Sequence, residues 1–171
     1  MATKDSLLHN ILIRGIDPKK RKSVQELASV VTPANAIDQL EARMIPEQIT
    51  DKSIPPPIIL GSGLASLLGL KVGELVKVVR PESNTEGELK PYKIVGIYDS
   101  GLKFYDNRIG ILALTDGQEL FNMKGRIHGF EIGLKDPNNS KLVADKMSAK
   151  YTLTIKEWRS FNKSMFDAME M

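Results

Sequence analysis

The sequence predicts an α+β fold in which β-strands alternate with short helices. Short apolar or β-branched runs have the length of strands, and the segments between them place apolar residues at helical spacing. Several strands return through a turn directly to another strand, which favours a mixed sheet over a purely parallel one. The runs expected to form strands are 11–16, 58–60, 75–79, 92–98 and 108–114.

The stretch 57–80 organises the chain and predicts strand, turn, short helix, turn and strand. The strand Ile58–Leu60 is followed by a Gly-Ser-Gly turn, in which Ser62 is expected to cap the helix. Gly69 stands where a left-handed residue commonly ends a helix. The helix is expected to present one apolar face made of Leu64, Leu67 and Leu68.

The elements on either side follow from the same patterns. A helix is expected after Pro33, with Thr32 as its cap and an apolar face from Ala36 to Met44. The polar loop from Pro81 to Pro91 lies between two strand-like runs and predicts a β-hairpin. A short helix capped by Thr115 or Asp116 is expected next.

Alternating residues predict two further strands near the C-terminal end. Residues 127–134 place His128, Phe130, Ile132 and Leu134 on one face, and residues 151–155 form the second strand, with a helix between the two. The last segment, 157–171, predicts an amphipathic helix without a stop signal. We therefore expect the natural chain to continue beyond it.

Composition sets the broad class. With 171 residues, 42% hydrophobic and 26% charged, the chain can bury a core and is typical of a soluble globular domain. No apolar run approaches the ~20 residues of a membrane helix, and no signal peptide is visible. The net charge of +3 is spread among interleaved acids and bases, which favours a solvated surface over a nucleic-acid partner. The absence of cysteine excludes disulfides, thiolate metal sites and cysteine nucleophiles.

Candidate chemistry is sparse. His9 and His128 lack the converging partners that a metal site needs, so we expect no metal and no cofactor. Asp99 and Asp106 flank a loop; acid–base catalysis by the pair is the less favoured interpretation, and caps of the loop are the more ordinary one. No catalytic residue is predicted.

Two alternatives of other classes stay open. Gly61-Ser62-Gly63, between a strand and a helix, resembles a phosphate-cradling turn and would suit a small enzyme that binds a phosphoryl ligand. Ser66 stands where the dinucleotide fingerprint needs a third glycine, so a structural turn is favoured. A nucleic-acid-binding barrel is suggested only by the basic charge and by the turn and strand at 69–79.

Four blocks in order resemble the periplasmic domain of lipoprotein-releasing ABC transporter permeases, the LolC/LolE family of the MacB/FtsX-like superfamily. The first is Ile13-Arg14-Gly15-Ile16-Asp17-Pro18, and the second runs from Ile59 to Glu74. The third joins Val95–Gly101 to Tyr105-Asp106, and the fourth is Trp158 with Phe161–Glu170. Their order and spacing extend over about residues 11–171.

The resemblance implies a MacB-like periplasmic core with two small lobes. The first, membrane-proximal lobe would comprise 1–56 and 136–171, and the second 57–135. It also implies a domain of a membrane protein at the periplasmic face of the inner membrane, with no active site of its own. Its partners would be lipoprotein cargo, a periplasmic lipoprotein carrier, a sister permease subunit and a cytosolic ATPase that supplies the energy.

The loop from Pro81 to Pro91 departs from the family pattern. In the LolC branch a long hairpin arm at this place grips the carrier, whereas here the loop is short and polar. This difference favours a LolE-like role in contact with the lipoprotein. The candidate residues for partner contact are Asn84, Glu86 and Leu89.

Overall fold

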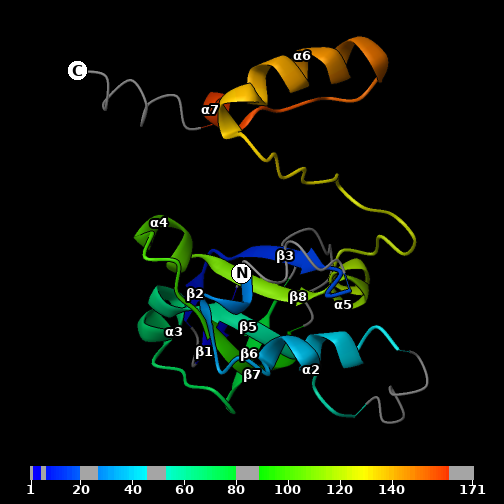
Figure 1. Cartoon of the computed structure of the whole chain (residues 1–171). Coiled ribbons are helices and arrows are strands. Elements are labelled where there is room, and N and C mark those ends of the chain that lie inside the picture. Colours follow the sequence, from blue (N-terminus) through cyan, green and yellow to red (C-terminus); the bar gives the residue numbers. More distant parts are fainter. Residues whose placement is uncertain (1, 5–6, 20–26, 46–52, 80–88, 162–171) are drawn as a thin grey trace. The chain divides into compact units, whose positions relative to one another are not determined.

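The computed structural model describes residues 2–4, 7–19, 27–45, 53–79 and 89–161 (Figure 1). The chain divides into two compact units, Met1–Ile127 and His128–Met171.

The first unit is built on one mixed sheet of eight strands, in the order β2-β1-β6-β7-β5-β8-β3, with β4 paired to β7. The pairs β5–β7 and β3–β8 are parallel, while β6–β7 and β5–β8 are antiparallel. The strands are β1 (Ala2–Lys4), β2 (Leu7–His9), β3 (Leu12–Ile16), β4 (Val31–Thr32), β5 (Pro57–Gly61), β6 (Leu75–Val78), β7 (Lys90–Tyr98) and β8 (Ile109–Ala113).

Helices pack on both faces of the central strands, and each face has its own apolar cluster. Alternate residues of a strand point to opposite faces, so β5 sends Ile58 and Leu60 into one cluster and Ile59 into the other. The first cluster includes residues of α3 (Ser62–Leu68) and of α5 (Leu114–Leu120). The second includes residues of α2 (Ala36–Ala42). A further short helix, α4 (Lys103–Asp106), precedes β8.

The predicted α+β class is confirmed, as are the strands expected over 11–16, 58–60, 75–79, 92–98 and 108–114. The hairpin prediction is also confirmed, because β6 and β7 pair antiparallel around the 80–88 segment, which lies outside the described residues. Gly69 ends α3 with φ 60° and ψ 37°, the left-handed conformation that glycine adopts without a steric penalty.

Four details of the predicted helices are wrong. Gly61, not Ser62, is the N-cap of α3, and α2 begins only at Ala36, so Thr32 is not its cap. α5 begins at Leu114, and neither Thr115 nor Asp116 is its N-cap. Leu67 is 58% exposed, because only Leu64 and Leu68 of the expected face point into the sheet.

The absence of a cap at Ser62 gives a prediction for stability. Ser62 already lies inside α3, and its side chain makes no capping hydrogen bond. Ser62→Ala is therefore expected to change the free energy of unfolding by less than about 0.5 kcal/mol, whereas loss of a true cap costs about 1 kcal/mol. Urea denaturation monitored by circular dichroism measures the difference. A loss above 1 kcal/mol would show that the hydroxyl has a structural role.

The expected division into two lobes, 1–56 with 136–171 and 57–135, stays a prediction. Strands from 1–56 and from 57–135 pair with each other in the same sheet, as β3 does with β8 and β4 with β7. The sheet therefore contains strands from both 1–56 and 57–135. The association of 136–171 with 1–56 stays a prediction.

The second unit contains a 3₁₀ turn η2 (Pro137–Asn139), α6 (Ser140–Lys150) and α7 (Trp158–Phe161). The strands predicted over 127–134 and 151–155 are wrong for this structure, since neither segment pairs. Extended segments need a neighbour for their backbone hydrogen bonds, and alternation alone does not supply one. Residues 162–171 of the predicted final helix lie outside the described residues.

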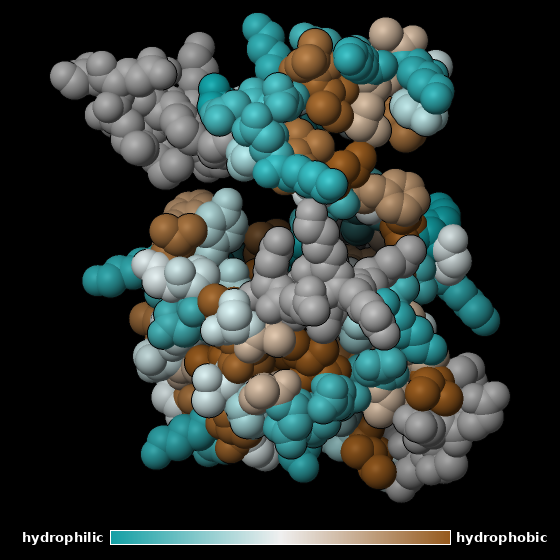
Figure 2. Space-filling model, in the orientation of Figure 1, coloured by the Kyte–Doolittle hydropathy of each residue, from teal (hydrophilic) through white to brown (hydrophobic). Residues whose placement is uncertain are grey.

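Hydrogen bonds hold the second unit together. Ser140 Oγ donates to Glu157 Oε1 at 2.5 Å, and this bond lowers the pKa of the Glu157 carboxyl. Arg159 Nη2 donates to Asn138 Oδ1 at 3.0 Å. Hydrophobic residues lie at the surface of this unit (Figure 2), namely Phe130, Ile132, Leu142, Tyr151 and Leu153. In the part of the chain that the structure describes, no helix is both long and apolar enough to cross a membrane.

Candidate functional site

One of the residues predicted for partner contact, Leu89, lies at the β6–β7 hairpin in the part of the chain that the structure describes. Leu89 lies immediately before β7 and is 45% exposed. Asn84 and Glu86, the other two predicted contact residues, lie outside the described residues. The structure therefore places one of the three, at the base of the loop.

The two faces of the hairpin differ in chemistry. Val76, Val78 and Tyr92 point inward and are almost completely buried in the first cluster. The opposite face exposes Leu75 and Lys77 from β6, with Pro91 and Lys93 opposite them on β7. The hairpin is thus anchored by one face and presents an apolar and basic surface with the other.

A partly buried ion pair lies next to this anchored face. The Arg43 guanidinium, just after α2, contacts the Asp116 carboxylate in the first turn of α5, with Nη2–Oδ1 at 2.9 Å and Nε–Oδ2 at 3.2 Å. The Asp116 side chain is 5% exposed and that of Arg43 21%. Thr115 Oγ1 also donates to the Arg43 carbonyl at 3.4 Å. Because α2 and α5 contribute to different clusters, the pair links the coverings of both faces of the sheet.

Burial and charge act on this group together. Burial raises the pKa of Asp116 above its ordinary value, and the Arg43 guanidinium opposes the shift. Burial likewise raises the pKa of the Tyr92 phenol, and the Asp116 and Glu119 carboxylates raise it further. Tyr92 is therefore within electrostatic reach of both acidic residues of α5.

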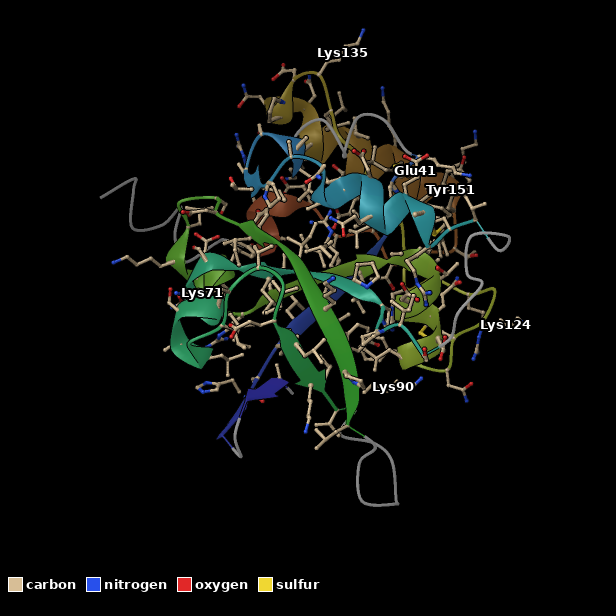
Figure 3. The ribbon with its side chains drawn as sticks, turned by 90° about the horizontal axis from the view of Figure 1, so that it is seen from below. Glu41, Lys71, Lys90, Lys124, Lys135 and Tyr151 are labelled. Carbon is tan, nitrogen blue, oxygen red and sulfur yellow. The ribbon has the colours of Figure 1, made fainter. Side chains whose placement is uncertain are left out.

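A second ion pair joins the same helix to the start of β7. Lys90 Nζ lies 2.8 Å from Glu119 Oε1, and Figure 3 labels Lys90 near the beginning of this long strand. The partners are 34% and 69% exposed, so the pair is solvated and weak by itself. Lys90 and Tyr92 are two positions apart on one strand and so share the face toward α5. The sequence gives no signal for this cluster, because Arg43 and Asp116 are 73 residues apart.

The Gly61-Ser62-Gly63 turn is packed rather than open. A Cβ at Gly61 would lie 2.1 Å from the Asp106 carbonyl oxygen, and one at Gly63 would lie 1.8 Å from Asn107 Oδ1. The glycines therefore allow the end of α4 to approach the backbone, and α3 has only seven residues. These contacts favour the structural turn over a phosphate cradle.

The other candidate residues have structural surroundings. Ser100 donates from its amide and its hydroxyl to Asp106 Oδ1 at 3.1 and 2.8 Å, and the Gly101 amide donates to Asp99 Oδ1 at 3.2 Å. Both acids cap the loop, although Asp106 is buried rather than solvated. His128 lies in the 127–134 segment, which forms no strand. Among the described residues no group of histidine and acidic side chains could hold a metal ion.

A second exposed surface surrounds α4. Leu102, Phe104 and Tyr105 are 59%, 67% and 41% exposed, and Arg108 lies 5.0 Å from the centre of the Phe104 ring. Two adjacent aromatics in an irregular segment are the signal that could have identified this surface.

The fold and these surfaces define a mixed-sheet α+β domain whose candidate site is an exposed hairpin. No family model matches the chain. It is similar to three proteins named "Lipoprotein-releasing system transmembrane protein LolC". The protein from Neisseria meningitidis serogroup B (strain MC58) is 27% identical over 172 residues, which cover 96% of this chain and 39% of that protein. Those from Xylella fastidiosa strains Temecula1 and 9a5c are each 23% identical over 167 residues, covering 94% of this chain and 37% of theirs.

These matches confirm the resemblance found from the sequence blocks. The chain spans less than two fifths of the length of these relatives. The three proteins are named LolC, so the matches do not support the LolE-like preference drawn from the short loop.

Proposed function

We propose that this chain is the extracytoplasmic domain of an ABC transporter permease that releases lipoproteins from the inner membrane to a periplasmic carrier. The observation that carries the proposal is the match of 96% of the chain to a protein named as part of a lipoprotein-releasing system. The domain acts by contacts with other proteins, and a separate ATPase subunit supplies the energy. The relatives are named as transmembrane proteins. The parent of this chain is likewise a membrane protein, with this domain on the periplasmic side.

The partners follow from this role. They are a lipoprotein cargo, a soluble periplasmic carrier, a sister permease subunit and the cytosolic ATPase. A simple observation tests the proposed membrane context: in the parent gene, apolar spans of about 20 residues should flank this segment. Their absence on both sides would contradict the membrane assignment.

We assign partner contact to the hairpin through Asn84, Glu86 and Leu89. The buried inner face anchors the hairpin, which leaves Leu89 exposed beside an apolar and basic surface. Exposed apolar side chains on a rigid support suit a protein contact. The phosphoryl-ligand enzyme is not favoured, since packed backbone surrounds its glycines.

Binding of the isolated domain to the carrier tests this assignment. The combined variant Asn84→Ala, Glu86→Ala, Leu89→Asp is expected to raise the Kd for the soluble carrier of the same bacterium at least about tenfold, measured by calorimetry. Leu67→Asp is the matched control, because Leu67 is 58% exposed on α3, outside the hairpin, and should keep the Kd within about twofold. Failure of the unaltered domain to bind either carrier or lipoprotein would refute the proposed function.

A further inference from the structure

The polar cluster beside the hairpin consists of Arg43, Asp116, Glu119, Lys90 and Tyr92, which come from segments far apart in the sequence. It joins three elements that are distant in sequence: the end of α2 through Arg43, α5 through Asp116 and Glu119, and the first residues of β7 through Lys90 and Tyr92. The two acids of α5 are three positions apart and so lie on one side of the helix. That side faces β7.

We propose that Arg43, Asp116 and Glu119 are positioning residues that fix the first residues of β7, and with them Leu89, in the orientation that the partner contact requires. The inference rests on the proposed function for its biological purpose. The positioning of β7 involves only residues that the structure describes, and it can be measured without any partner.

Two side chains near the start of β7, Lys90 and Tyr92, are held by their surroundings. The Lys90–Glu119 pair holds the side chain next to Leu89 at 2.8 Å. The Tyr92 ring, 2% exposed, packs two residues further along the same face, within electrostatic reach of Asp116. Arg43 in turn fixes the Asp116 carboxylate with three hydrogen bonds of 2.9–3.3 Å. Loss of Arg43 would remove the hydrogen bonds that fix this carboxylate.

The pairing of β7 shows why such support matters. Leu89 precedes the hydrogen-bonded pair Lys90 with Val78, the last pair of the β6–β7 ladder next to the 80–88 segment. The terminal pair of a hairpin opens most readily, because it has a neighbouring pair on one side only. The Lys90–Glu119 ion pair with α5 and the burial of Tyr92 in the first cluster oppose that opening where Leu89 would meet a partner.

Amide hydrogen exchange of the isolated domain tests the positioning. Asp116→Asn keeps the shape of the side chain and removes its charge, and it is expected to speed exchange at the amides of residues 90 and 92–94 about five- to tenfold relative to the amides of β5. Lys90→Glu should have a smaller effect in the same place, about threefold. The double variant Lys90→Glu, Glu119→Lys restores an opposite-charge pair and should bring exchange back to within twofold of the unaltered domain.

The control is Lys93→Glu, which makes the same change of charge on the opposite, exposed face of the same strand. It should leave β7 exchange unchanged. Unchanged exchange in Asp116→Asn, or failure of the charge swap to restore it, would overturn the proposal.

Carrier binding by the same variants separates this inference from the proposed function. If the unaltered domain binds carrier, Asp116→Asn should raise the Kd about threefold or more, and the charge swap should recover most of the affinity lost in Lys90→Glu. Faster exchange with an unchanged Kd would refute the purpose assigned to the cluster. Absence of binding by the unaltered domain would refute the proposed function itself, while the exchange result would still decide whether the cluster positions β7.

Discussion

Gly61→Ala is expected to lower the free energy of unfolding by about 3 kcal/mol, because the new methyl group meets backbone that cannot move aside cheaply. Its Cβ would lie 2.1 Å from the Asp106 carbonyl oxygen and 3.0 Å from the Ile109 side chain. The conformation of Gly61, with φ −62° and ψ 143°, is open to alanine, so the loss would report packing and not backbone strain. Urea denaturation measures the difference.

Gly129→Ala is the control for this prediction. Apart from Gly129 itself and its two chain neighbours, no atom lies within 4 Å of the Cβ that it would add, so the stability should change by less than about 0.5 kcal/mol. If Gly61→Ala proved as stable as the unaltered protein, the close approach of α4 to the turn would be wrong. The phosphate-binding interpretation of that turn would then need to be considered again.

Arg43→Met is expected to cost about 3 kcal/mol near pH 7, because it leaves the Asp116 carboxylate buried without its partner. The cost should depend on pH. The pKa of Asp116 is raised in the folded protein, so above the ordinary aspartate value the folded state binds more protons than the unfolded state, and stability falls as pH rises through that window. Arg43 lowers this pKa, so its removal raises the pKa further and widens the window.

The loss caused by Arg43→Met should therefore shrink as pH falls from about 7 toward 4, where the carboxyl takes up a proton. Thermal or urea unfolding of both proteins over this range measures the trend. Lys90→Met is the control: it breaks the exposed pair with Glu119 and should cost no more than about 1 kcal/mol. A loss of the same size at every pH would indicate that Arg43 acts through packing of its aliphatic stem.

The candidate site was predictable only in part. The hairpin followed from two strand-like runs around a polar loop, and the structure shows Leu89 of that loop immediately before β7. Partner contact by Leu89 stays a prediction. The Arg43–Asp116 pair was not predictable, since nothing local in either segment specifies a partner 73 residues away. Asp116 was expected to be a possible helix cap, and the fold instead buries it against a guanidinium.

The sequence by itself determined five of the eight strands of the first unit, but not β1, β2 or β4. Strand propensity, apolar runs and glycine conformations are local properties. Gly69 in its left-handed cap and the buried strand at Ile58–Leu60 are examples. Only the tertiary structure decided which segments share a sheet: it joined β3 to β8 across the expected lobe boundary and left the alternating residues 127–134 without a partner strand. A strand is completed by hydrogen bonds to another segment, and the identity of that segment depends on how the whole chain packs.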